Sequence, residues 1–220
     1  MTFVFNISKG ARKRVVRSFG AGQYLTDECI QCVFAACPNV PSDVELLSPA
    51  VAYCMSIGDA AENAPDTQGK KLIVAPINNS PDGSADSGTH WTLLLGVREA
   101  SANIIWMHLN SATPRGGGGA NYARAKKAAE MLTGRKAMVE KVPCSQQTNG
   151  YDCGVYVLMF TLIALRALSN VDVAGALRRE CVMPSSLMVR TPFAEIFASQ
   201  CLGGPGPAQL HGLTFKWLSK

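Results

Sequence analysis

The sequence lacks any apolar run long enough to cross a membrane. Its longest such run, residues 155–165, has about half of the ~20 residues that a membrane-spanning helix needs, and Arg166 ends it. No secretory signal is visible either, because the basic residues within 9–17 follow a very short apolar patch instead of preceding a long one. We therefore expect a core helix at 155–165, no membrane partner, and a reducing compartment, cytoplasmic or nuclear.

Charge of either sign is also scarce. Charged residues make up 17% of the chain and leave a formal net charge of +5, whereas 47% of the residues are hydrophobic. This composition is typical of a folded soluble domain and not of a disordered chain. The one basic cluster, within residues 9–17, could be a nuclear or mitochondrial address, but we favour a solvated first helix and expect no nucleic-acid partner.

The length of 220 residues predicts a single domain, and we expect a monomer. We assign residues 22–202 to this domain. A basic N-terminal segment, 1–21, precedes it and need not be well ordered. After Cys201, a stretch rich in glycine and proline begins a linker and C-terminal tail, 203–220.

The chain has eight cysteines, and in a reducing compartment we expect thiols and not disulfides. Cys29 and Cys32 form a CxxC pair near Cys37 and Cys54, which could indicate zinc. The first three, however, fall at helical spacing among apolar residues. Buried thiols in a core helix are therefore the favoured interpretation, and no metal site is predicted.

Helical and extended patterns are mixed along the chain and predict an α+β fold. Short segments rich in β-formers and bounded by turn residues predict strands at 70–78, 90–97, 103–110 and 136–142, the second and third as a hairpin. Helical spacing predicts helices at 24–37, between the glycines at 116–119 and Gly134, and at 153–168, 172–181 and 191–202.

Cys153 lies where a polar turn meets an apolar helix, in "QQTNGYDCGVYVLM" (146–159). The unpaired amides at a helix N-terminus stabilise a thiolate, so this position predicts a pKa below the ordinary value of about 8.5. Asn149-Gly150 is a strong turn signal that could aim backbone amides at whatever Cys153 attacks. A core cysteine that merely begins a helix explains the local stretch equally well.

Histidine is scarcer still, with only three in the chain: His90, His108 and His211. A cysteine nucleophile needs an imidazole to take the thiol proton and to protonate the leaving group. His211 falls in the predicted tail, and His108 alternates with Asn110 on a strand and is a weak candidate. His90 opens a predicted strand at a sheet edge, and it is the best candidate for the base.

Three motifs, in this order, resemble those of the sentrin- and SUMO-specific (Ulp-type) cysteine proteases. They are "GTHWTLLLGV" (88–97), "WMHLNS" (106–111) and "SQQTNGYDCGVYV" (145–157). With "LLSPAVAYC" (46–54) and "LIVAPINN" (72–79), the similarity spans roughly residues 22–168 and is greatest to the deneddylase branch. It implies a papain-like or adenain-like α+β fold, in which a central mixed sheet carries the histidine and packs against a buried helix that starts at the nucleophilic cysteine.

By this resemblance Cys153 is the nucleophile and His90 the general base and acid. Gln147 would donate its side-chain amide to the oxyanion, together with the backbone amide of Cys153. Asn110 stands where the family usually has an aspartate that orients the histidine. Its oxygen could accept the Nδ1-H bond but supplies no negative charge, so we expect an active but slower enzyme.

The family binds the diglycine tail of a ubiquitin-like protein between two aromatic walls. Trp91 matches one wall, and Tyr24 replaces the usual tryptophan of the other, in a motif that retains Asp27. The implied reaction is acyl transfer through a thioester, without metal or cofactor. The implied partners are a ubiquitin-like protein with a C-terminal Gly-Gly and its conjugates, which are cullins if the enzyme is a deneddylase.

Two other classes stay open. Asn110 and Tyr24 are compatible with a weakly active or inactive module that binds ubiquitin-like proteins, although the intact Cys153, His90 and Gln147 favour an enzyme. An acetyltransferase on the same fold is the second alternative, and Trp91 favours the protease over it. The sequence does not discriminate among ubiquitin, SUMO and the cullin modifier, nor between precursor processing and isopeptide cleavage.

Overall fold

The computed structural model describes residues 15, 17–20, 22–37, 40–59, 65–83, 87–112 and 118–182. In chain order the elements are α2 (Asp27–Ala36), β1 (Val44–Leu46), α3 (Pro49–Ile57), β2 (Leu72–Asn78), β3 (Trp91–Arg98), β4 (Ile104–Leu109), α4 (Gly118–Thr133), β5 (Val139–Val142), α5 (Cys153–Ala167) and α6 (Val173–Glu180). The predicted helix at 191–202, His211 and the predicted tail lie outside the described residues. No helix within these ranges is long and apolar enough to span a bilayer.

The five strands form one mixed sheet in the order β1-β2-β3-β4-β5. Strand β3 is antiparallel to both β2 and β4, whereas β1 runs parallel to β2 and β5 runs parallel to β4. The predicted hairpin of the second and third strands is confirmed by the antiparallel pairing of β3 with β4. The start of β3 and the end of β4 therefore lie at the same end of the sheet, which brings the residues that flank these strands together.

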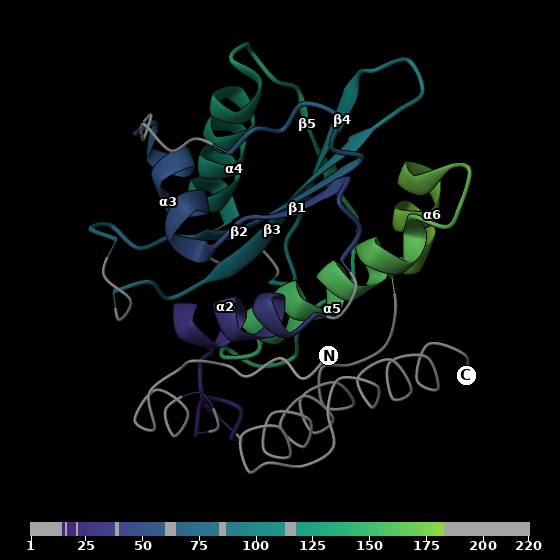
Figure 1. Cartoon of the computed structure of the whole chain (residues 1–220). Helices are drawn as coiled ribbons and strands as arrows, with labels where there is room; N and C mark the ends of the chain where they lie inside the picture. The colour runs from purple at the N-terminus through teal and green to yellow at the C-terminus, as the bar shows by residue number, and fades with distance from the viewer. Residues whose placement is uncertain are drawn as a thin grey trace.

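Helices cover both faces of the sheet (Figure 1). Helices α3 and α4 lie on one face, where Leu94 and Ala128 belong to the same apolar cluster. Helices α2 and α5 lie on the other face, with Leu93 and Leu95 in a second cluster that also includes residues of α6. Because both faces are covered, β2 and β3 are buried along nearly their whole length, which explains their uninterrupted apolar sequences. The expected α+β fold is confirmed.

The helix predicted at 153–168 is confirmed as α5, and most of its residues are buried. It is apolar on nearly all sides because the sheet covers one side and α2 approaches from another (Figure 1). Its second residue, Gly154, permits close packing, since a Cβ there would lie 2.8 Å from Cβ of Leu25. Side chains of ordinary size would push α5 away from the segment that leads into α2.

Two elements were not predicted, β1 and α3. Ser48 caps α3 by accepting a hydrogen bond from the amide of Val51 at 3.2 Å, Pro49 occupies its first turn, and Gly58 ends it with φ of 81°. The last predicted strand is shorter than expected and begins at Val139, after an exposed Met138.

Part of the N-terminal segment packs against the domain. Val15 and Phe19 are buried in the cluster that contains α2 and α5, although they precede the predicted domain start at residue 22. Cys29 and Cys32 are buried in the same cluster, as the helical spacing predicted. The domain limits 22–202 stay a prediction.

Candidate active site

Cys153 is the first residue of α5 and is almost wholly buried, with 1% of its surface exposed. The turn before it is closed by Asn149, whose Oδ1 accepts the amides of Tyr151 and Asp152 at 3.1 and 3.0 Å. Its Nδ2 also donates to Oδ2 of Asp152 at 2.8 Å. The turn predicted from Asn149-Gly150 is therefore held by the asparagine side chain, and it places the cysteine at the helix N-terminus.

The thiol of Cys153 lies beside the backbone of β3. Backbone amides of Trp91, Gly154 and Cys153 itself donate to the sulfur and lower its pKa, whereas burial and the nearby charge of Asp152 raise it. Burial is the largest of these effects, so the pKa of Cys153 is raised above its ordinary value. The prediction of a lowered pKa is thus wrong for this structure, because the amides of the helix end compensate only partly for the loss of water around the thiolate.

His90 immediately precedes Trp91, so the amide contact to the sulfur also brings the imidazole-bearing residue to Cys153. The ring also contacts the residue that follows β4: Nε2 of His90 and Oδ1 of Asn110 are 2.9 Å apart. Burial lowers the pKa of His90, and the bond to Asn110 partly offsets this effect. A raised thiol pKa and a lowered imidazole pKa together favour a neutral pair over a thiolate-imidazolium pair in the free protein.

The bond to Asn110 uses the other ring nitrogen than expected. The expectation that Nδ1 of His90 makes this contact is wrong, because the ring faces Asn110 with Nε2. Oδ1 of Asn110 also accepts the amide of Ala112 at 3.0 Å. The amide oxygen is thereby fixed toward the imidazole, which leaves Nδ1 of His90 as the nitrogen available to the thiol.

Two further side chains, which no motif of the sequence indicates, hold the backbone around His90. Oδ1 of Asn79 accepts the amides of Thr89 and His90 at 2.8 and 2.9 Å. Nδ2 of Asn121, a fully buried residue of α4, lies 3.2 Å from the carbonyl oxygen of His90. Asparagines are common in loops and carry no positional signal of their own, so only the fold assigns these two to the site.

Gln147 is brought to the same end of the sheet. Its amide donates to the carbonyl oxygen of Ser111 at 2.7 Å, and the hydroxyl of Ser111 donates to its Oε1 at 2.9 Å. Its Nε2 donates to the carbonyl oxygen of Asn149 at 2.6 Å, within the turn that leads to Cys153. Gln147 therefore lies between the end of β4 and the start of α5, and its role as an oxyanion donor stays a prediction.

Two of the three predicted tunnel residues lie next to this site. Trp91 is buried, and its Nε1 donates to the carbonyl oxygen of Leu25 at 3.0 Å. Tyr24 is about half exposed, and its hydroxyl lies beside Gly150, 4.0 Å from where a Cβ on that glycine would be. Asp27 is the first residue of α2, one turn away from this wall.

His108, the weaker histidine candidate, has a structural role. It is buried, and its Nε2 lies 3.0 Å from Oγ1 of Thr92, against the edge of the Tyr122 ring. Burial, with smaller effects of the charges of Lys141 and His90, lowers the pKa of His108 to about 4. His108 therefore joins β4 to β3 as a neutral imidazole. Because it contacts Tyr122 of α4, it lies on the face of the sheet opposite α5 and Cys153.

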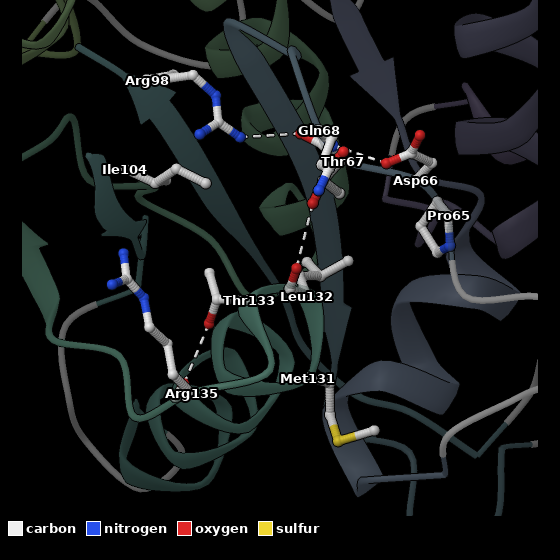
Figure 2. Close-up of a pocket in the computed structure, with 10 residues that line it drawn as sticks. All are labelled: Pro65, Asp66, Thr67, Gln68, Arg98, Ile104, Met131, Leu132, Thr133 and Arg135. Atoms are coloured by element: carbon white, nitrogen blue, oxygen red, sulfur yellow. Dashed lines mark hydrogen bonds between the residues drawn. The ribbon is translucent and has the colours of Figure 1, made fainter. Parts of the chain in front are cut away.

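An open pocket of about 450 Å³ lies at the opposite end of the sheet, and it contains none of the candidate catalytic residues. Figure 2 shows its lining, which includes Arg98 from the end of β3 and Arg135 from beyond α4. The Arg98 guanidinium donates to the carbonyl oxygens of Thr67, Lys70 and Ala102, so it ties loops together. Among the described residues, no group of three or more acidic, histidine or cysteine side chains is placed to hold a metal ion.

A family model described as the Ulp1 protease family, C-terminal catalytic domain, matches residues 122–190, which include Gln147 and Cys153. A probable sentrin-specific protease 8 of Dictyostelium discoideum is 30% identical over 133 residues, 54% of this chain and 54% of the relative. NEDD8-specific protease 1 of Arabidopsis thaliana is 29% identical over 155 residues, 61% of this chain and 62% of the relative. The chain thus spans less than two thirds of the length of these two relatives.

The fold is also found among solved structures. The C-terminal Ulp1 protease domain in complex with Smt3, the yeast ortholog of SUMO, matches with a TM-score of 0.55 at 16% identity, covering 92% of this chain and 100% of that domain. The shared architecture confirms the expected protease-like fold. The family match, the two relatives and the fold together confirm the resemblance drawn from the motifs: the chain is similar to the catalytic domain of the Ulp1 protease family in sequence over residues 122–190, and it shares the fold of that domain.

Proposed function

We propose that this protein is a cysteine peptidase that cleaves after the C-terminal Gly-Gly of a ubiquitin-like modifier, and that the modifier is NEDD8. The observation that carries the proposal is the meeting of three segments: Cys153 at the start of α5, the His90-Trp91 peptide at the start of β3, and Asn110 after β4. The choice of NEDD8 is supported by the specificity in the name of the Arabidopsis relative and by the motif similarity to the deneddylase branch.

In the proposed reaction His90 acts as a general base at the moment of attack, because the free pair is neutral. Its Nδ1 takes the thiol proton while the sulfur of Cys153 bonds to the carbonyl carbon of the terminal glycine. The oxyanion is bound by the amide of Cys153 and by Nε2 of Gln147. His90 then protonates the departing amine, and water hydrolyses the thioester with the same histidine as base.

Two aromatic side chains support the proposal that the diglycine tail of the modifier reaches Cys153 between two rings. Trp91 is fixed by its bond to the Leu25 carbonyl, and Tyr24 lies beside the turn before Cys153. A tail without side chains can pass between such rings where a longer side chain cannot. We propose that the conjugates cleaved are cullin-type, and that the enzyme acts as a monomer in the cytoplasm or nucleus.

The test is labelling with NEDD8, SUMO and ubiquitin probes, each carrying an electrophile at the C-terminal glycine, with the adduct followed by intact-protein mass. We expect the NEDD8 probe to label the wild type and Cys144→Ala but not Cys153→Ala. Cys144 is a matched control because it lies nine positions earlier, is half-buried and has its pKa raised to about 11 by burial.

Other outcomes would select among the alternatives. Labelling only by SUMO or ubiquitin keeps the peptidase and overturns the choice of modifier. Binding of an unmodified modifier without labelling by any probe favours an inactive binding module. Transfer of an acetyl group from acetyl-CoA by wild type and not by Cys153→Ala, without probe labelling, favours an acetyltransferase.

A further inference from the structure

Ser111 contacts Gln147 at two points. The serine is 2% exposed and follows Asn110 directly, two residues after the last residue of β4. Its carbonyl oxygen accepts the amide of Gln147 at 2.7 Å, and its hydroxyl donates to Oε1 of the same residue at 2.9 Å. Ser111 thus bonds both to the backbone amide of Gln147 and to its side-chain oxygen.

The two ends of a glutamine amide have nearly the same shape, so hydrogen-bond partners decide which end faces a substrate. In Gln147 the Ser111 hydroxyl occupies the oxygen end, and the carbonyl oxygen of Asn149, which can only accept, occupies one hydrogen of Nε2 at 2.6 Å. The second hydrogen of Nε2 is the one left for an oxyanion. Loss of the serine hydroxyl would leave Oε1 without this donor, so that only the bond from Nε2 to the Asn149 carbonyl would still orient the amide.

We propose that Ser111 is a positioning residue that orients the Gln147 amide as an oxyanion donor, and this inference rests on the proposed function. Because Asn110 holds the imidazole of His90 and Ser111 holds the amide of Gln147, two adjacent residues at one strand end align the base and the oxyanion donor. The proposed function requires the glutamine as donor but assigns no role to the serine.

The inference is tested by a double-mutant cycle on hydrolysis of a NEDD8 C-terminal amide substrate, with kcat and KM measured for wild type, Ser111→Ala, Gln147→Ala and the double variant. Removing an oxyanion donor costs about 10²–10³ in kcat. We expect Ser111→Ala to lower kcat about tenfold with KM nearly unchanged, since a misdirected donor forfeits only part of that stabilisation. In the Gln147→Ala background the serine substitution should then have no further effect.

Two controls separate positioning from a general loss of structure. Ser56→Ala removes a similarly buried hydroxyl, which donates to the Tyr53 carbonyl in α3, and should leave kcat unchanged. Alkylation of Cys153 by iodoacetamide forms no oxyanion and should proceed at the wild-type rate in Ser111→Ala. A slowed alkylation would indicate disturbance of the thiol itself and would overturn the proposal.

The outcomes also separate this inference from the proposed function. A wild type that cleaves no modifier substrate overturns both. A cleaving wild type with an unaffected Ser111→Ala, or with an equal loss in both backgrounds, overturns only the role of Ser111.

Discussion

Nε2 of His90 and Oδ1 of Asn110 lie 2.9 Å apart and join the residue before β3 to the residue after β4. The contact orients the imidazole with a neutral oxygen, so the ring gains a fixed direction but no compensating charge. Burial consequently lowers the pKa of His90, while burial raises that of Cys153. In the proposed reaction this arrangement makes His90 a general base, which takes the proton as the sulfur of Cys153 attacks.

We predict that Asn110→Asp increases the reactivity of Cys153 at low pH. A carboxylate at this position stabilises the imidazolium and raises the pKa of His90, which in turn favours the thiolate. The rate of alkylation by iodoacetamide, measured against pH, should therefore extend to lower pH in the variant than in the wild type.

Asn110→Ala is the matched control for this substitution. It removes the acceptor for both His90 and the amide of Ala112 without adding charge, and it should lower kcat about 10²-fold by misplacing the base. An unchanged or upward-shifted pH profile in Asn110→Asp would contradict the neutral-pair description.

We predict that Asn79→Ala lowers kcat about tenfold, because small displacements of a catalytic group have large effects on rate. The substitution deletes the acceptor for the amides of Thr89 and His90. Asn79→Asp keeps an acceptor oxygen in the same place and should retain most of the activity. The prediction is wrong if Ala and Asp variants have the same kcat on the modifier substrate.

We predict that the protein loses stability between pH 7 and pH 5 through His108. Its pKa is lowered to about 4 in the folded state by burial, whereas an unfolded histidine titrates near 6.5. The unfolded state therefore binds more protons below pH 6.5, and stability falls as pH drops from there toward 4. The expected loss is about 2 kcal/mol at pH 5, measured by urea unfolding.

His108→Gln tests this assignment, because glutamine is neutral at both pH values. The groups that face His108 are Thr92 and Tyr122, with Lys141 and His90 as the charges that act on it. The variant should lose most of the difference in unfolding free energy between pH 7 and pH 5. An unchanged difference would attribute the pH dependence to other groups.

We predict that Gly154→Ala lowers both stability and activity. The added methyl would lie 2.8 Å from Cβ of Leu25, which cannot move freely because its carbonyl oxygen holds the Trp91 indole. Such overpacking typically costs about 1–3 kcal/mol, and it displaces the start of α5, where Cys153 lies. Thermal unfolding and probe labelling report the two effects.

Gly119→Ala provides the comparison. This glycine lies near the start of α4, and a Cβ there would meet nothing within 4 Å. Alanine is a better helix former than glycine, by up to about 1 kcal/mol, so the control should be neutral or stabilising. Equal destabilisation by the two substitutions would argue against the close packing of α5 on Leu25.

Local patterns predicted the strongly apolar elements well but missed the short ones. Strands β2, β3 and β4, and the helix α5, were found because their apolar runs are long and bounded by turn residues. Helix α3 was overlooked although Ser48, Pro49 and Gly58 mark its two ends, because it has only nine residues and little amphipathic contrast. β1 has three residues, too few for any period to appear.

The amino-acid sequence alone predicted the chemistry of the candidate site from a cysteine at a turn-helix boundary, one suitable histidine, and motifs that resemble one protease family. Only the three-dimensional structure shows that burial raises the pKa of Cys153, that Nε2 of His90 faces Asn110, and that Ser111 and Asn79 contact Gln147 and the amide of His90. These properties depend on desolvation and on distances between segments far apart in the chain. No local pattern of residues encodes such distances, because they are set only when the strands pair and α5 packs against the sheet.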